Sequence, residues 1–248
     1  MFTTPKNWDA HVADAESIAR SAGFRELRDR IVDLAQPKAE HTVVDVGSGT
    51  GLLTLAFAER TARVWAIDSS RAMNEYLRVK ASSAGLDNVE TVLASAVSLP
   101  LVDDIADLVV SNYCFHELRR ADKQRALAEA MRVLKPGGRL VIGDMMFSFN
   151  PMQTRDRRVV SVKLRALARR GLPGVARVLK NVLRQASGTG EHPANAAWWR
   201  EALERSGFQH IEIDTLAHEG GIATADAPAP SAGVRRPPAR QPLTGINR

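Results

Sequence analysis

The chain has 248 residues, of which 44% are hydrophobic and 25% are charged, and its formal net charge is +6. This composition is typical of a globular protein with its own core and excludes a disordered chain. The sequence has no apolar run near the roughly 20 residues of a membrane span, and its N-terminus lacks an apolar core of signal-peptide type. The single cysteine, Cys114, excludes an intramolecular disulfide and a cysteine metal cluster. We therefore predict a reduced, cytoplasmic protein without a bound metal.

Helical stretches and short apolar runs alternate along the first part of the chain. Residues 1–38 are expected to form a helical lid, because apolar residues recur at helical spacing over 10–35 and Pro37 ends the pattern. The predicted strands are then 42–46, 64–67, 89–94, 105–110 and 139–144, and the predicted helices are 52–59, 71–84 and 123–134. Residues 135–138, Lys-Pro-Gly-Gly, are expected to stop the last helix and turn into the fifth strand.

The pattern of these elements indicates the fold class. Strands that are apolar throughout and alternate with helices are typical of a parallel sheet with helices on both faces. We therefore predict an α/β fold with a doubly wound, mostly parallel sheet, which binds its ligands beyond the carboxyl ends of the strands.

A basic segment and a tail follow the predicted fifth strand. Between Arg155 and Arg184 there are ten lysines and arginines against one acid, in a predicted helical insertion over 152–190. The remaining predicted elements are a helix over 196–206 and a strand over 210–216. Residues 1–226 are expected to form a single domain, and residues 227–248 a disordered Pro/Arg-rich tail.

The basic charge is confined to residues 155–184 and the tail, and the rest of the chain is net acidic. A nucleic-acid partner held by the whole surface is therefore excluded. The basic segment has three interpretations. It could be a lid helix packed on the domain, a peripheral contact with an anionic membrane surface, or a contact with phosphates.

The turn after the first predicted strand carries a glycine motif, Asp45-Val46-Gly47-Ser48-Gly49-Thr50-Gly51. Glycines at such a turn permit positive φ and allow a ligand to approach the bare backbone. The dinucleotide pattern G-x-G-x-x-G would need glycine where Leu52 stands, and an acid lies two residues before the first glycine. This spacing argues against a bound pyrophosphate and suits a ligand with an ammonium and a sulfonium group.

These residues resemble the class I S-adenosylmethionine-dependent methyltransferases. The family's acid-x-Gly-x-Gly-x-Gly motif is matched from Asp45 to Gly51, and Asp68 matches the acid that binds both ribose hydroxyls. Residues 132–140 match the family's turn before strand five. The resemblance covers residues 40–225 and implies a seven-stranded Rossmann-like sheet with S-adenosylmethionine as cofactor.

The resemblance also implies a set of cofactor-binding residues. They are Asp45, Gly47, Ser48, Gly49, Gly51, Asp68, Ser69, Met73, Ser95, Ala96 and Asn112. Many relatives carry Asp-Ala where this chain has Ser95-Ala96, so the contact with the adenine amine lacks a charge and cofactor affinity should fall by about 1 kcal/mol. For Asp68 an alternative stays open, a helix N-cap without a ligand.

Methyl transfer from a sulfonium needs alignment and exclusion of water, and it needs a base only if the nucleophile must lose a proton. His116 lies in the segment 111–118, where relatives bring the acceptor, and imidazole suits general-base work. The alternative is that His116 caps or packs the following helix. Asp144 could orient an acceptor hydroxyl or merely solvate a loop, and Trp8 and His11 are expected to cover the cofactor.

Residues 198–223 are more loosely similar to the closing segment of the ubiquinone/menaquinone-biosynthesis and related small-molecule methyltransferases, which act on lipophilic acceptors. The prediction is therefore a methyltransferase that acts on carbon or oxygen of a small, lipophilic metabolite. Two alternatives stay open, an RNA methyltransferase that uses the basic insertion and a protein that binds S-adenosylmethionine without catalysis. Leu52 disfavours a nicotinamide oxidoreductase.

Overall fold

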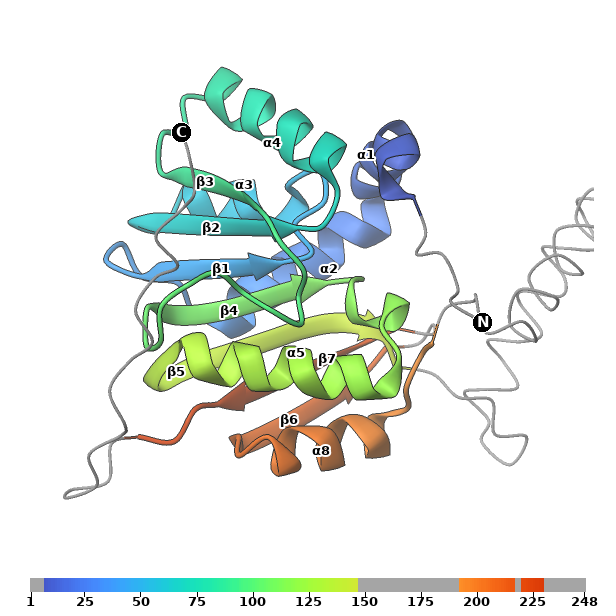
Figure 1. Ribbon diagram of the computed structural model, residues 1–248, viewed down its shortest axis with the longest axis vertical. Coiled ribbons are helices and arrows are strands. Elements are labelled where there is room, and N and C mark those ends of the chain that lie inside the picture. Colours follow the sequence, from blue (N-terminus) through green and yellow to red (C-terminus); the bar gives the residue numbers. More distant parts are fainter. Residues whose placement is uncertain (1–6, 147–191, 217–219, 230–248) are drawn as a thin grey trace, which may run out of the picture.

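The computed structural model describes residues 7–146, 192–216 and 220–229, and Figure 1 shows them as one twisted sheet with helices on both faces. The predicted basic insertion and most of the predicted tail lie outside these residues. In the described part of the chain, no helix combines the length and the apolar character needed to cross a membrane.

The described residues form a seven-stranded sheet in the order β3-β2-β1-β4-β5-β7-β6. The strands are β1 (Thr42–Val46), β2 (Arg63–Asp68), β3 (Val89–Leu93), β4 (Ala106–Asn112), β5 (Leu134–Met145), β6 (Gln209–Thr215) and β7 (Gly220–Asp226). The first five strands pair in parallel, whereas β7 is antiparallel to both β5 and β6. The predicted α/β class with a mostly parallel sheet is confirmed.

Helices cover both faces of the sheet. They are η1 (Trp8–His11), α1 (Val12–Ala19), α2 (Ala22–Ala35), α3 (Leu52–Ala58), α4 (Arg71–Ser83), η2 (Phe115–Glu117), α5 (Arg120–Val133) and α8 (Ala196–Arg205). On the inner strand β1, Val43 is buried with residues of α2 and α3, and its neighbour Val44 is buried with residues of α5 and α8. A strand covered on both faces has to be apolar at successive positions, which explains the adjacent valines Val43 and Val44 of β1.

The N-terminal region differs from its prediction, because the expected single helix over 10–35 is divided into η1, α1 and α2. The break lies at Arg20 and Ser21, and Ser21 has an extended backbone with ψ of 150°. Serine is a favoured residue at a helix start, so a new helix can begin there. The consequence is that α1 contacts α4, whereas α2 packs against β4 and β5.

Residues 135–138 also differ from the predicted turn, since they belong to β5, which begins directly after α5. Ala106 pairs with Leu134 and Leu108 pairs with Arg139, so β5 advances five residues while β4 advances two. Gly137 accommodates this irregularity with φ of +77°, which a residue with a Cβ rarely adopts. Beyond it the two strands pair regularly up to Asn112 and Gly143.

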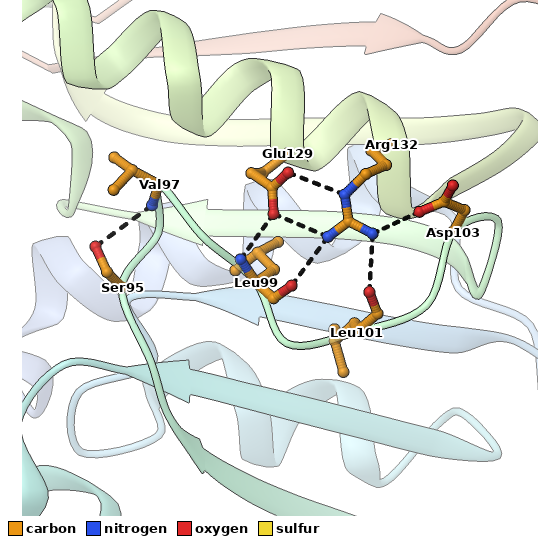
Figure 2. A network of polar contacts seen from close by, with 7 residues as sticks. All are labelled: Ser95, Val97, Leu99, Leu101, Asp103, Glu129 and Arg132. Carbon is orange, nitrogen blue, oxygen red and sulfur yellow. Dashed lines mark hydrogen bonds and ion pairs between the residues drawn. The ribbon is translucent and has the colours of Figure 1, made fainter. Parts of the chain in front are cut away.

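The segment between β3 and β4 is held to α5 by Arg132 (Figure 2). The Arg132 guanidinium donates to the carbonyl oxygens of Leu99 and Leu101, at 2.9 and 2.8 Å, and to Asp103 at 2.7 Å. It also donates to Glu129, whose Oε2 accepts from the Leu99 amide at 2.7 Å. This network fixes the loop that begins with Ser95 and Ala96.

Candidate cofactor and active site

A cavity of about 490 Å³ lies at the carboxyl ends of β1, β2, β3 and β4, where a doubly wound sheet binds its ligands. The predicted site residues that line it are Asp45, Gly47, Ser48, Gly49, Asp68, Ser69, Met73, Ser95, Ala96, Asn112 and His116. Gly51 is the exception. It does not line the cavity. A Cβ at this position would come within 2.3 Å of Leu77 Cδ1, so the absence of a side chain allows α4 to pack closely on the turn.

The glycine turn has the positive φ angles that its sequence predicts. Gly47 has φ of +74° and Gly49 has φ of +51°. A Cβ on Gly47 would lie 2.4 Å from Cys114 Sγ, so a side chain there would displace the segment after β4. The Gly47 amide donates to the Ile67 carbonyl at 2.8 Å, which ties the turn to the end of β2.

Asp68 lies at the end of β2 and joins the glycine turn to the start of α4. Its Oδ2 accepts from the Gly49 amide and its Oδ1 from the Ser70 amide, both at 2.8 Å. Burial raises the pKa of Asp68, and these amides partly offset the effect. The N-cap of α4 is Ser70, whose Oγ accepts from the Met73 amide at 3.1 Å. The interpretation of Asp68 as the helix N-cap is therefore wrong.

Asp45 is a second carboxylate at the cavity, and it is only 1% exposed. Its Oδ2 accepts from Thr54 Oγ1 at 2.6 Å. Burial raises the pKa of Asp45 to about 7, and the nearby negative charge of Asp68 adds to this effect. The cavity thus carries two carboxyl groups that a cationic ligand would stabilise in their ionised form.

The remaining polar groups of the cavity fit a polar, cationic ligand. Ser48 Oγ and Asn112 Oδ1 are buried without a hydrogen-bond partner among the described residues, and both residues line the cavity. The described residues that line it include no lysine or arginine. Buried polar atoms are normally hydrogen-bonded, so these two are available to a bound molecule. Carboxyl groups and orphaned oxygens are the partners that the ammonium and ribose groups of S-adenosylmethionine need.

The N-terminal elements cover one side of the cavity. Trp8, Ala15 and Ile18 line it, whereas His11 does not and instead contacts Asp14 at 3.5 Å. Asp9, which no sequence motif singled out, also belongs to this cover, and its Oδ1 accepts from Ser70 Oγ at 2.5 Å and from the Ala72 amide at 3.0 Å. A helix start attracts a carboxylate, but no local pattern identifies α4 as the helix that Asp9 would meet.

The structure brings together two residues that the sequence analysis considered separately. His116 Nδ1 and Asp144 Oδ1 are 2.8 Å apart, and the two side chains are 7% and 1% exposed. α5 begins after Arg119, so His116 does not cap it. Asp144 is buried and does not solvate a loop. His116 lines the cavity beside Glu117, whose Oε1 lies 3.6 Å from His116 Nε2.

Apolar and aromatic side chains form the wall around His116. The Tyr113 ring packs edge-on against the His116 ring, with centroids 5.7 Å apart, and Phe24 packs on Tyr113 at 4.8 Å. Met145 and Cys114 also line the cavity. Burial raises the pKa of the Cys114 thiol, which keeps it neutral and unsuited to act as a nucleophile.

Known proteins with similar sequences are methyltransferases. A family model described as a methyltransferase domain matches residues 43–138. The uncharacterized methyltransferase YcgJ of Bacillus subtilis is 33% identical over 114 residues, which are 46% of this chain and 44% of that protein. Demethylmenaquinone methyltransferase of Thermus thermophilus is 41% identical over 117 residues, 46% of this chain and 52% of that protein. The chain thus spans about half the length of the curated relatives it matches.

Solved structures share the fold over most of the chain. The cyclase SpnF has a TM-score of 0.67 at 18% identity and covers 91% of this chain and 95% of its own. An S-adenosylmethionine-dependent methyltransferase of Aquifex aeolicus has a TM-score of 0.61 at 19% identity, and the match covers 87% of this chain and 98% of that protein. The likeness to these solved structures shows the shared fold alone, whereas the sequence matches relate part of the chain to known methyltransferases. The family model and the curated relatives show that part of this chain, including residues 43–138, is similar to known methyltransferases.

Proposed function

We propose that this protein is an enzyme that transfers a methyl group from S-adenosylmethionine to carbon or oxygen of a small, lipophilic metabolite. The observation that carries the proposal is the convergence of the glycine turn, Asp45 and Asp68 on one cavity at the carboxyl edge of the sheet. S-Adenosylmethionine supplies an electrophilic methyl group on a sulfonium. The chain has to hold it, align the acceptor and exclude water.

The cofactor-binding residues keep the roles that the family resemblance implies. Asp68 would bind the ribose hydroxyls, Asp45 would attract the ammonium group, and Ser95 with Ala96 would contact the adenine. Ser69, Met73, Asn112, Ser48 and the backbone of Gly47 and Gly49 complete this part of the cavity. For Gly51 we propose a supporting role, because its closest neighbour is Leu77 on α4.

The acceptor side of the cavity supports a lipophilic substrate. Phe24, Tyr113, Leu118 and Met145 supply aromatic and apolar surface there. Among the relatives, ubiquinone/menaquinone biosynthesis C-methyltransferase of Vibrio vulnificus is 35% identical over 127 residues. A quinone-like acceptor is therefore one form of the proposal. A peripheral membrane contact through 155–184 and a cytoplasmic location also stay predictions.

The two alternatives from the sequence are less well supported. An RNA substrate would place phosphates near the cavity, but its described lining has carboxylates and no lysine or arginine. The fold does not by itself require methyl transfer, because a protein named as a [4+2]-cyclase shares it. The position of His116 in the cavity favours catalysis instead.

Calorimetry with S-adenosylmethionine and S-adenosylhomocysteine tests the cofactor part of the proposal. We expect saturable binding of both ligands. Asp68→Ala should weaken it by about 1–3 kcal/mol, the cost of losing a hydrogen bond to a charged group. Asp87→Ala, at an exposed position before β3, is the matched control and should bind as the wild type does. Absence of binding to the folded protein at millimolar ligand would contradict the proposal, and unchanged affinity in Asp68→Ala would remove that residue from the site.

The acceptor can be sought without a prior guess. The protein is incubated with carbon-13 methyl-labelled S-adenosylmethionine and, in separate reactions, with an organic-solvent extract of cells or with total cellular RNA, and mass spectrometry identifies molecules that gain the label. A labelled lipophilic product is the expected result. Label in RNA alone would favour the nucleic-acid alternative, and binding of the cofactor without any labelled product would favour the non-catalytic one.

A further inference from the structure

We propose that Lys123 is a positioning residue for methyl transfer, because its buried ammonium group joins the turn 114–118 to the segment that begins at His192. The inference rests on the proposed function and adds to it a residue that does not line the cavity. It is carried by the geometry of two backbone segments that meet at one ammonium group.

The burial of Lys123 is unusual for a lysine. Lys123 lies near the start of α5 and is 0% exposed, and it is not among the described residues that line the cavity. Lysine is almost never fully buried unless it is paired. The N-terminal end of a helix carries a positive partial charge, and Arg120 lies in the same turn, so α5 itself disfavours an ammonium group here. Contacts with other segments therefore have to explain this residue.

Lys123 joins two segments that are far apart in the sequence. Its Nζ donates to the carbonyl oxygens of Leu118 and His192, the latter at 2.6 Å. Leu118 ends the turn 114–118, directly after η2, and His192 begins the described segment that leads to α8. The His192 amide in turn donates to the His116 carbonyl at 2.6 Å. Both backbone groups of His192 are therefore bound, one to the turn and one to the lysine that also binds the turn.

Charged groups on two elements act on the ammonium group. Burial has the largest influence and lowers the pKa of Lys123 to about 8. The carboxylates of Asp144 on β5 and Asp122 on α5 partly offset this effect, whereas Arg120 adds to it. The ammonium form is therefore present at neutral pH, and it is lost as the pH rises through about 8.

The titratable groups of the two joined segments behave differently from Lys123. Cys114 belongs to the turn 114–118, and burial raises the pKa of its thiol, so the thiol stays neutral. Burial and the nearby ammonium group lower the pKa of His192, so this imidazole is uncharged at neutral pH and above. Arg119 and Glu117 also face His192. A change of this junction near pH 8 is therefore assigned to Lys123.

The turn 114–118 forms part of the cavity wall, whereas the cofactor side is held by other contacts. The residues of this turn that line the cavity are Cys114, His116, Glu117 and Leu118. On the cofactor side, Asp68 is held by the Gly49 and Ser70 amides, and neither hydrogen bond involves Lys123. Loss of the ammonium group should therefore displace the acceptor without releasing the cofactor.

Carbon-13 NMR tests the junction without any acceptor, and the titration is recorded with and without S-adenosylhomocysteine. The shift of the Lys123 ε-carbon should titrate near pH 8, and Lys123→Met assigns its signal. The carbonyl shifts of Leu118 and His192 should follow the same titration, because both carbonyl groups accept from this ammonium group. A Lys123 titration near the ordinary value of 10.5, or carbonyl shifts that do not follow it, would overturn the proposal.

Methyl transfer from carbon-13 methyl-labelled S-adenosylmethionine to the cell extract provides the functional readout. Lys123→Met should lower the rate by about 10²-fold, the loss that a displacement of about 1 Å causes. The affinity for S-adenosylhomocysteine, measured by calorimetry, should stay unchanged. Lys38→Met is the matched control, because Lys38 is exposed, and it should transfer methyl groups as the wild type does. Full activity of Lys123→Met, or an equal loss of cofactor affinity, would contradict the positioning role.

The pH profile separates positioning from a purely structural role. At saturating cofactor, the wild-type rate should fall as the pH rises through about 8. Lys123→Arg keeps its charge, because a guanidinium is not deprotonated in proteins, so its rate should stay level over the same range. An alkaline fall in Lys123→Arg equal to that of the wild type would count against the inference, and this comparison holds even if Lys123→Met does not fold. No transfer by the wild type would count against the proposed function, and the carbonyl titration would then decide the role of Lys123 alone.

Discussion

Asp45 and Asp68 place two carboxyl groups in a cavity whose described lining has no cationic side chain. Burial raises the pKa of both residues, and that of Asp45 reaches about 7. In the unfolded chain the pKa of Asp45 would be near the ordinary aspartate value of 3.8. Its contribution to stability is therefore complete below that pH and is lost as the pH rises toward 7. At pH 7 and above, the ionised Asp45 therefore makes the folded protein less stable than an uncharged residue at this position would. A bound cationic ligand would offset this loss of stability.

The raised pKa of Asp45 predicts a pH-dependent cofactor affinity. An ammonium group stabilises the ionised carboxylate, so binding should weaken as the pH falls below about 7, by at most about tenfold per pH unit. Calorimetry in two buffers with different ionisation enthalpies should detect proton release on binding near pH 7. Asp45→Asn keeps the size of the side chain and should abolish that release. An equal release in this variant would assign the proton to another group.

At the scale of elements, β3 and β4 are connected by a loop that contains no helix, and Ser95 and Ala96 of this loop line the cavity. Arg132 and Glu129 of α5 supply the hydrogen bonds that this loop does not make within itself (Figure 2). The planar guanidinium can contact several acceptors at once, which an ammonium group cannot do. The loop that we propose to contact the adenine therefore depends on a helix that follows it in the chain.

Arg132→Met should destabilise the protein by about 2 kcal/mol, because the partly buried carbonyl groups of Leu99 and Leu101 lose their donor. Urea unfolding of the purified variant measures the loss. Arg132→Lys should recover only part of it. Arg125→Met is the control on the same helix, since Arg125 is 67% exposed and pairs with Asp122 on the surface, where such pairs contribute little. Equal losses at the two positions would contradict this role of Arg132.

A second element-scale contact joins the N-terminal segment to α4. Asp9 binds Ser70 and the first turn of α4, and these hydrogen bonds lower its pKa. Glu16 of α1 adds a bond to Lys80 at 2.9 Å. Because Trp8, Ala15 and Ile18 line the cavity, this contact holds the cover over the cofactor site.

Asp9→Ala should therefore loosen η1 and α1 while leaving the sheet intact. Hydrogen exchange measured by mass spectrometry should become faster over residues 8–19, and S-adenosylhomocysteine should dissociate faster. Asp14→Ala is the control, because the side chain of Asp14 is 80% exposed and contacts only His11 in the described structure. Unchanged protection over 8–19 in Asp9→Ala would show that packing alone holds the cover.

At the scale of the whole molecule, the site forms where segments from four parallel strands meet at one edge of the sheet. Their order in the sheet, with β1 between β2 and β4, brings the glycine turn, Asp68 and His116 to the same cavity. The antiparallel β7 then completes the sheet between β5 and β6 (Figure 1). The same edge therefore carries the groups proposed to bind the cofactor and the aromatic wall around His116.

The parallel part of the fold could be predicted from the sequence, because burial on both faces produces apolar runs and glycines mark a turn with positive φ. The positions of Asp45 and Asp68 follow from the same local pattern. Arg20 and Ser21 could not be recognised as a helix break, since the apolar periodicity continues across them and the break depends on where α1 and α2 pack. The strand character of 135–138 depends on hydrogen bonds with residues that directly follow β7, such as the one from the Ala227 amide to the Gly138 carbonyl at 2.8 Å.

The amino-acid sequence by itself determined the strands, the glycine turn and the two carboxylates of the cofactor side, because each depends on residues close in the chain. Only the tertiary structure decided the pairing of His116 with Asp144, of Asp9 with Ser70 and of Arg132 with its loop. The register of β4 against β5 aligns Asn112 with Gly143 after residues of β5 are looped out, and this brings Asp144 to His116. A side-chain contact of this kind depends on register and packing between distant segments, which no local pattern records.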